Sequence, residues 1–267
     1  MAASAPAAAA ARALVFCRDI ETRRLVLESL RPFAILPELC EDSLTAVSLL
    51  DKQKFEAVIT DLALGDEARL IVRRLELSPS NRRAVTFGIG CPQTPEDNPD
   101  AMFLFRWPLT PAPMVQTVKA AYGLIVRERR RSFRCPVSVP AFLWAGGSQV
   151  LMCNTVNISE GGLAVAANPA WGGIKPQTVR FSLPGSPREL SSEVRATWQH
   201  EDGLMGLQFT SLNGEQAAEL QEWLRMRLDE ALPPEVAELF RGAVQSAGSA
   251  QPSGENRECP IGTTLRG

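Results

Sequence analysis

Histidine is almost missing from this sequence of 267 residues, since His200 is the only one. The six cysteines show no C-x-x-C spacing and have no cluster of histidines beside them. Zinc sites draw on closely spaced cysteine and histidine ligands, so we expect no structural metal. The cysteine spacing also gives no disulfide framework, and free thiols in a reducing cytosol are the simpler expectation.

Long apolar runs are lacking as well. No stretch approaches the roughly eighteen apolar residues of a membrane-spanning helix, so we expect no membrane insertion. The net charge is only −2, which favours neither nucleic acid nor an acidic surface as a partner of the whole chain. The alanine-rich residues 1–12 carry their only arginine after the alanines, unlike a secretory signal, and are expected to be a disordered leader. The chain is therefore expected to be cytoplasmic.

The composition, 45% hydrophobic and 22% charged, is that of a globular chain, and the length predicts about two domains. In the first half, short apolar runs typical of buried strands alternate with amphipathic segments typical of helices. The expected strands are residues 13–17, 33–39, 55–60, 84–89 and 102–105. This alternation predicts an α/β domain, a doubly wound parallel sheet over residues 13–126. Its last helix, from Pro113, has no break until about Ser132.

This half resembles a receiver domain of the response-regulator kind, with Asp61 at the end of the third strand, where the resemblance places the phospho-acceptor. Residues that depart from the family pattern are Cys17 and Arg18 for the acidic pair, Gly88 or Ile89 for the hydroxyl, and Trp107 for the lysine. Magnesium prefers carboxylate oxygens, and Arg18 would repel it. Without a metal or a lysine, the charge on a transferred phosphoryl group has little to stabilise it. We expect a pseudo-receiver that serves as an interaction or dimerisation platform, with Asp61 unphosphorylated.

From Cys135 onward the period of the apolar residues changes to two. The short strands expected at residues 150–156, 163–167, 179–183, 190–198 and 204–209 predict a small antiparallel β-barrel. A helix from Gly214 carries one apolar stripe that would cover a barrel end. The expected division is a leader (1–12), the pseudo-receiver (13–126), the barrel domain (127–232), and a short helix with a disordered tail (233–267).

Residues 127–134 hold five arginines in eight positions. Guanidinium groups suit paired contacts with phosphate and stacking on a flat ring. Asn157 and Ser159 lie on one side of an extended chain, because side chains alternate there. Gly161 and Gly162 permit a tight turn or a close approach of backbone. Together these features suit a ligand that has both phosphates and heterocyclic faces.

The order of these features resembles a known family. Arg130-x-x-x-Arg134, then a hydrophobic strand, then Asn157-x-Ser159-x-x-Gly162, is similar to the two-part signature of PilZ domains. The resemblance covers roughly residues 127–230 and implies binding of cyclic di-GMP, a bacterial second messenger.

The resemblance also implies a role for each motif residue. Arg130 and Arg134 would hold phosphates and stack on guanine, while Asn157 and Ser159 would contact guanine edges or phosphate. Gly162 would let the backbone come close. Arg129 and Arg131 are adjacent and would assist, and the sequence does not say which of them points inward.

The sequence gives less support to other functions. No nucleophile–base pair, carboxylate cluster or glycine-rich phosphate loop indicates an enzyme, and no cofactor is expected beside the ligand. The arginine run has no aromatic interleaving or wider basic face, so it does not favour nucleic acid. The alternative is a non-binding adaptor in which both domains are degenerate. The downstream protein partner is left unidentified, and a homodimer stays open.

Overall fold

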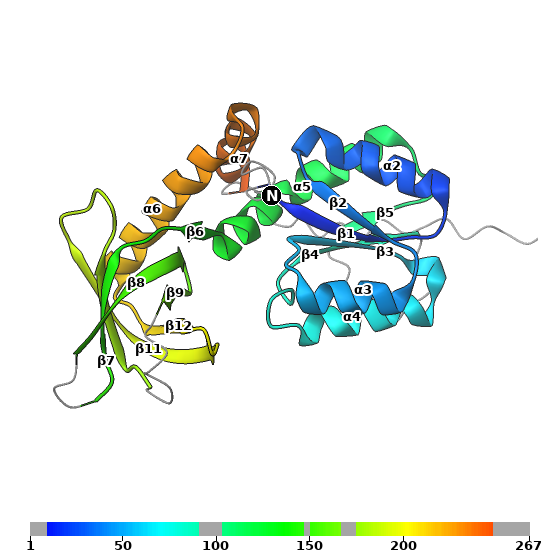
Figure 1. Cartoon of the computed structure of the whole chain (residues 1–267). Coiled ribbons are helices and arrows are strands. Elements are labelled where there is room, and N and C mark those ends of the chain that lie inside the picture. The colour runs from blue at the N-terminus through cyan, green and yellow to red at the C-terminus, as the bar shows by residue number, and fades with distance from the viewer. Residues whose placement is uncertain (1–9, 91–102, 147–149, 167–174, 248–267) are drawn as a thin grey trace, which may run out of the picture.

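The computed structural model describes residues 10–90, 103–146, 150–166 and 175–247 of the chain. Two sheets are joined through one long helix, α5 (Pro111–Ser132), which packs on the first sheet and ends beside the second (Figure 1). This confirms the expectation that the helix runs unbroken to Ser132. No helix in the described part of the chain is long and apolar enough to cross a membrane.

The first sheet is parallel, with the strand order β2-β1-β3-β4-β5. Its strands are β1 (Arg12–Phe16), β2 (Leu36–Cys40), β3 (Ala57–Asp61), β4 (Val85–Ile89) and β5 (Phe103–Phe105). Helices α2 (Ile20–Leu30) and α5 pack together on one face, and α3 (Ser43–Lys52) packs with α4 (Asp66–Leu77) on the other (Figure 1). This order is that of doubly wound, flavodoxin-like folds, which confirms the predicted α/β domain.

Local chemistry sets the limits of these elements. The Asp19 carboxylate caps α2 by accepting a hydrogen bond from the Thr22 amide at 2.7 Å. β2 begins three residues later than expected, because the chain after α2 continues in the 3-10 turn η1 (Arg31–Phe33) and leaves it through Ala34 at a φ of 51°. Arg12 opens β1 and so is not part of the leader; residues 1–9 of the leader and 248–267 of the tail lie outside the described residues.

The second sheet is antiparallel and closed, as the sequence predicts. Six strands form a ring in the order β8-β7-β10-β11-β12-β9, which closes because β9 also pairs with β8, and the short β6 adds to β8. These strands are β6 (Arg134–Pro136), β7 (Pro140–Trp144), β8 (Val150–Ser159), β9 (Gly162–Ala166), β10 (Thr178–Ser182), β11 (Glu189–Gln199) and β12 (Leu204–Ser211).

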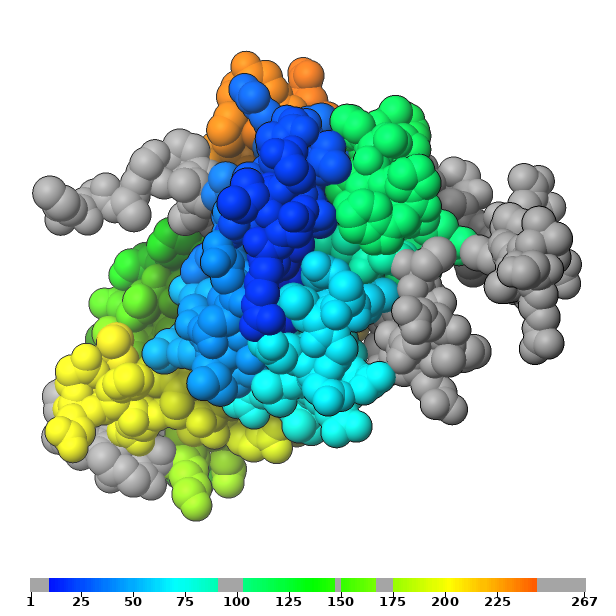
Figure 2. All heavy atoms as spheres, turned by 90° about the vertical axis from the view of Figure 1, so that its right-hand side faces the viewer, coloured from blue at the N-terminus to red at the C-terminus, as the bar shows by residue number. Residues whose placement is uncertain are grey.

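Two helices follow the barrel. α6 (Gly214–Ala231) buries the apolar stripe that its sequence predicts, and Trp223 also donates from its indole Nε1 to the carbonyl of Pro184 at 3.2 Å. α7 (Pro234–Ala247) returns to α5, where the ring of Phe240 meets that of Tyr122 edge-on with 6.1 Å between the centroids. Seen from the side of the first domain, α7 (orange) lies along its upper edge and the barrel (yellow) beside its lower edge (Figure 2).

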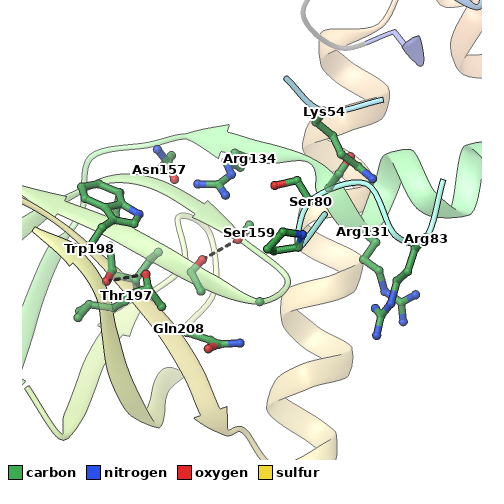
Figure 3. A pocket seen from close by; sticks show the side chains of 18 of the residues that line it. Lys54, Ser80, Arg83, Arg131, Arg134, Asn157, Ser159, Thr197, Trp198 and Gln208 are labelled. Carbon is green, nitrogen blue, oxygen red and sulfur yellow. Dashed lines mark hydrogen bonds between the residues drawn. The ribbon is translucent and has the colours of Figure 1, made fainter. Parts of the chain in front are cut away.

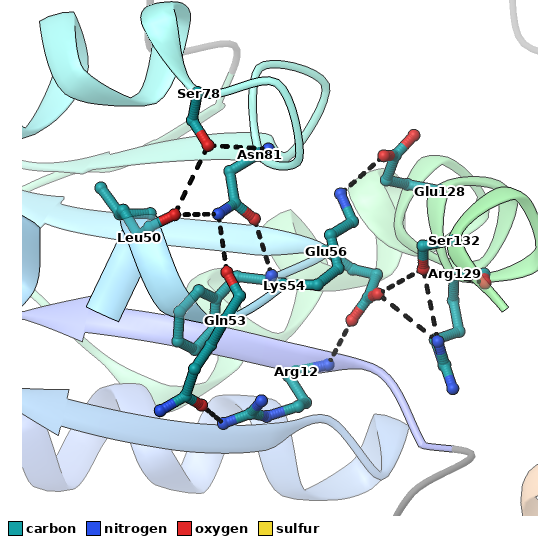
Figure 4. A network of polar contacts seen from close by, with 11 residues as sticks. Arg12, Leu50, Gln53, Lys54, Glu56, Ser78, Asn81, Glu128, Arg129 and Ser132 are labelled. Carbon is teal, nitrogen blue, oxygen red and sulfur yellow. Dashed lines mark hydrogen bonds and ion pairs between the residues drawn. The ribbon is translucent and has the colours of Figure 1, made fainter. Parts of the chain in front are cut away.

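The two domains meet around a buried carboxylate, that of Glu56, immediately before β3. Glu56 is only 2% exposed and accepts hydrogen bonds from the Arg12 amide at 2.8 Å and from the Ser132 hydroxyl at 2.7 Å (Figure 4). The guanidinium of Arg129, 3.8 Å away, supplies a balancing charge. Lys54 and Glu128 add a second ion pair at 2.7 Å. The last turn of α5 is therefore held in one place against the first domain.

We expect Glu56→Ala to lower the free energy of unfolding by about 3 kcal/mol, because it removes the buried carboxylate that faces the buried guanidinium of Arg129. Urea unfolding of the intact protein measures this. Glu76→Ala, at an exposed position of α4, is the control and should change the value by less than about 0.5 kcal/mol. Equal stability of the two variants would contradict the role given to Glu56.

Candidate ligand-binding site

A cavity of about 570 Å³ lies between the first domain and the barrel (Figure 3). Its first-domain wall is Lys54 and the turn between α4 and β4, from Pro79 to Arg83. The end of α5 and the start of β6 form a second wall, and the barrel strands β8, β9, β11 and β12 form the third. The volume is within the range of small-molecule sites.

The barrel wall contains the polar residues singled out by the sequence. Asn157 and Ser159 on β8 and Gly162 on β9 all line the cavity. β6 pairs antiparallel with β8 so that Arg134 lies opposite Ser159, which brings the end of the arginine segment directly to these residues. The hydroxyl of Ser159 donates to the carbonyl of Gly162 at 2.9 Å and fixes the turn between β8 and β9.

Gly162 has a packing reason to be glycine. A Cβ built there would stand 2.1 Å from the backbone oxygen of Leu207 on β12, the neighbouring strand. At Gly161, which is exposed and also borders the cavity, an added Cβ would meet nothing within 4 Å. The close approach of two strands at Gly162 thus shapes the cavity floor.

An aromatic side chain also lines the cavity, and sequence reasoning did not assign it to the site. Trp198 on β11 pairs with Gly206 on β12, and a Cβ on Gly206 would come within 2.2 Å of the indole nitrogen. The indole therefore lies across the position that the glycine leaves open, and Trp198 is 38% exposed and lines the cavity (Figure 3). A tryptophan opposite a glycine on paired strands is the signal that identifies it.

The arginines of the segment point in three directions, since successive residues of a helix are turned by about 100°. Arg131 lines the cavity together with Arg134. Arg129 turns the opposite way, toward Glu56, and its guanidinium lies over the ring of Phe133. Of the two neighbours of Arg130, Arg131 lines the cavity and Arg129 does not.

Arg130 lies outside this cavity. It lines a separate cavity of about 590 Å³ between α5 and α6, which Arg131 also borders. Burial lowers the pKa of the Arg130 guanidinium, and the nearby Asp229 opposes that shift. Its Nε atom is buried and has no hydrogen-bond partner among the described residues. The structure thus separates Arg130 from Asn157 and Ser159, because α5 stays helical to Ser132 and only Arg134 continues into β6.

A second group of residues lies at the carboxyl end of the first sheet, around Asp61. One carboxylate oxygen of Asp61 accepts from the amide of Ala63 at 3.0 Å, which caps the 3-10 turn η2 (Leu62–Leu64), and the other lies 3.6 Å from the Cys17 thiol. Burial, with a further contribution from Asp61, raises the pKa of that thiol to about 11. The thiol is therefore neutral at physiological pH.

The neighbours of Asp61 do not assemble a metal site. Arg18 donates twice to the carboxylate of Glu67, at 2.9 and 2.7 Å, so that this acidic group is paired with a guanidinium. Ile89 on β4 lies opposite Asp61, and neither it nor Gly88 carries a hydroxyl. The described residues contain no group of three or more histidines, cysteines or acids able to hold a metal ion.

Comparison with known proteins places the second half of the chain. The family model of the PilZ domain matches residues 128–226. The chain therefore contains a PilZ domain. It is preceded by a receiver-like domain with the strand order β2-β1-β3-β4-β5. No curated protein sequence matches the chain significantly.

Solved structures resemble each half separately. The chemotaxis response regulator CheY4 of Vibrio cholerae is 17% identical, with 42% of this chain and 98% of that chain covered and a TM-score of 0.38. The PilZ domain of CeSA from a cellulose-synthesizing bacterium is 23% identical, covering 35% and 95%, with a TM-score of 0.28. The inhibitor of motility MotI/DgrA of Bacillus subtilis is 16% identical, covering 35% and 48%, with a TM-score of 0.30.

We expect Gly162→Ala to destabilise the PilZ domain by about 2 kcal/mol, because the added methyl group forces β9 away from β12. Gly161→Ala is the matched control, one residue away with open space around its Cβ, and should leave stability within about 0.5 kcal/mol. Thermal unfolding of both variants checks this, and equal melting temperatures would show that the strands tolerate the methyl group.

Proposed function

We propose that the chain is a cyclic di-GMP effector whose PilZ domain binds the dinucleotide in the cavity beside the receiver-like domain. The observation that supports this most directly is the convergence of Arg131 and Arg134 on Asn157, Ser159 and Gly162 around one cavity. The family match at residues 128–226 makes cyclic di-GMP the ligand to test first.

The chemistry of the walls fits the two parts of such a ligand. Arg131 and Arg134 offer permanently charged, forked donors for phosphate oxygens. Asn157 carries both a donor and an acceptor, as the edge of guanine requires, and the indole of Trp198 offers a flat face for stacking. Gly162 lets β9 approach β12 closely beneath these residues. The cavity thus pairs cationic contacts with aromatic and amide contacts.

Arg130 is not assigned the direct phosphate contact that the motif implies. In the arrangement described here, its guanidinium lies against α6, near Asp229 and Glu222. It would reach the dinucleotide only if the last turn of α5 unwound and these acidic neighbours were given up. We therefore assign the direct phosphate contacts to Arg131 and Arg134.

The effect of binding would pass through α5. This helix belongs to the receiver-like domain at its start and carries Arg131 of the cavity in its last turn, and Arg134 opens β6 two residues after the helix ends. A ligand that binds Arg131 acts on the last turn of α5, which also contacts Glu56, so ligand binding and the domain arrangement are coupled. Coupling between such sites is commonly about 1–3 kcal/mol. The output would be altered contact with a downstream protein.

Calorimetric titration of the intact protein with cyclic di-GMP tests this function. We expect saturable binding, and we expect Arg134→Ala to weaken it tenfold or more, because a charge-assisted hydrogen bond contributes about 1.5–3 kcal/mol. Arg188→Ala, at an arginine of the barrel domain that is 69% exposed and away from the cavity, should leave the Kd unchanged.

The opposite result is also informative. If the wild-type protein shows no saturation at high micromolar ligand, the effector function is wrong. The chain would then be an adaptor that keeps the PilZ fold without its ligand.

A further inference from the structure

One wall of the cavity belongs to the receiver-like domain and carries cations that no PilZ motif includes. Arg82 and Arg83 lie in the turn between α4 and β4, and both line the cavity opposite Asn157 and Ser159. Figure 3 shows the side chain of Arg83, in the receiver-like domain, running in the same direction as that of Arg131 at the end of α5. The two domains thus present arginine to one shared space.

The charges around this space are unbalanced. The pair Lys54–Glu128 is neutral as a unit at 2.7 Å. The guanidinium groups of Arg82, Arg83, Arg131 and Arg134 have no carboxylate partner among the described residues. Four like charges around about 570 Å³ repel one another, and this repulsion is relieved by a polyanion that enters between them.

The turn that carries Arg82 and Arg83 is anchored rather than loose. Asn81, fully buried, donates from Nδ2 to the carbonyls of Leu50 and Gln53, both at 2.8 Å, and accepts from the amide of Phe55 at 2.8 Å (Figure 4). The next residues, Arg82 and Arg83, therefore leave a fixed point of the backbone. Exposed arginines on a free loop lose much of their binding energy to ordering, whereas these begin from a preorganised turn.

The relative position of the walls is also set. Phe55 and Glu56 are the two residues before β3, so the residue held by Asn81 adjoins the carboxylate that holds Ser132 and Arg129. One short segment thus connects the turn of Arg82 and Arg83 to the end of α5. The cationic groups on both sides of the cavity are placed by the same two residues, Phe55 and Glu56.

We propose that Arg82 and Arg83 of the receiver-like domain contact the phosphates of the bound cyclic dinucleotide, so that the ligand bridges the two domains. This inference rests on the proposed function, whose ligand it adopts. It gives the receiver-like domain a role that needs no phosphorylation of Asp61: the domain supplies half of the cationic contacts of the site. The affinity for the ligand then depends on whether the two domains are in this arrangement.

The test is a calorimetric titration of the intact R82A/R83A variant with cyclic di-GMP, beside the wild type. We expect the Kd to rise at least about tenfold and to become less sensitive to salt, because two cationic contacts are lost. R82K/R83K should recover part of the affinity. Arg73→Ala, an exposed arginine of α4 outside the cavity, is the control and should bind as the wild type does.

The outcomes separate the two proposals. If the wild type binds and R82A/R83A binds with the same Kd and salt dependence, the bridging inference is wrong and the effector function stands. If the wild type does not bind, both are overturned. Thermal unfolding without ligand should be equal for R82A/R83A and wild type, and a large drop in the variant's melting temperature would assign the two arginines a structural role instead.

Discussion

The arrangement of the two domains depends on the buried carboxylate of Glu56, which needs hydrogen-bond donors and an opposite charge around it. Glu56 is almost fully buried, and a buried charge is tolerated only when donors and an opposite charge surround it. The partner from β1 is the amide of Arg12, and the partners from the last turn of α5 are Ser132 and Arg129. The interactions of this one side chain therefore fix the position of the end of α5, where the chain enters the barrel.

The same helix turn distributes the arginines among different tasks. Arg129 neutralises Glu56, Arg130 lies against the acidic residues of α6, and Arg131 faces the cavity. A structural role and a ligand-binding role are thus carried by adjacent residues on one turn. Any force on Arg131 acts on the interdomain contact two residues away, which is the physical basis for coupling binding to domain arrangement.

Much of the fold could be predicted from the sequence, because the apolar period changes sharply near Cys135 and strong caps such as Asp19 mark the helix starts. The strand order of the first domain and the closure of the barrel follow the predicted classes. The site was harder to predict. The spacing of Arg130 and Arg134 does not reveal that α5 ends between them, and the contribution of Arg82 and Arg83 depends on how the domains pack, which no local pattern encodes. Trp198 was missed because its exposure arises from a glycine on the next strand.

The central claim is that one anionic ligand is held between both domains, and hydrogen exchange of the intact protein with and without cyclic di-GMP measures it most directly. The account predicts that saturating ligand slows amide exchange in two places at once: at residues 158–163 of the PilZ domain and at residues 81–84 of the receiver-like domain, which are separate in sequence but share the cavity. Protection of the PilZ residues alone would contradict a bridging ligand. Unchanged exchange in both places, at ligand concentrations that should saturate the site, would contradict the account as a whole.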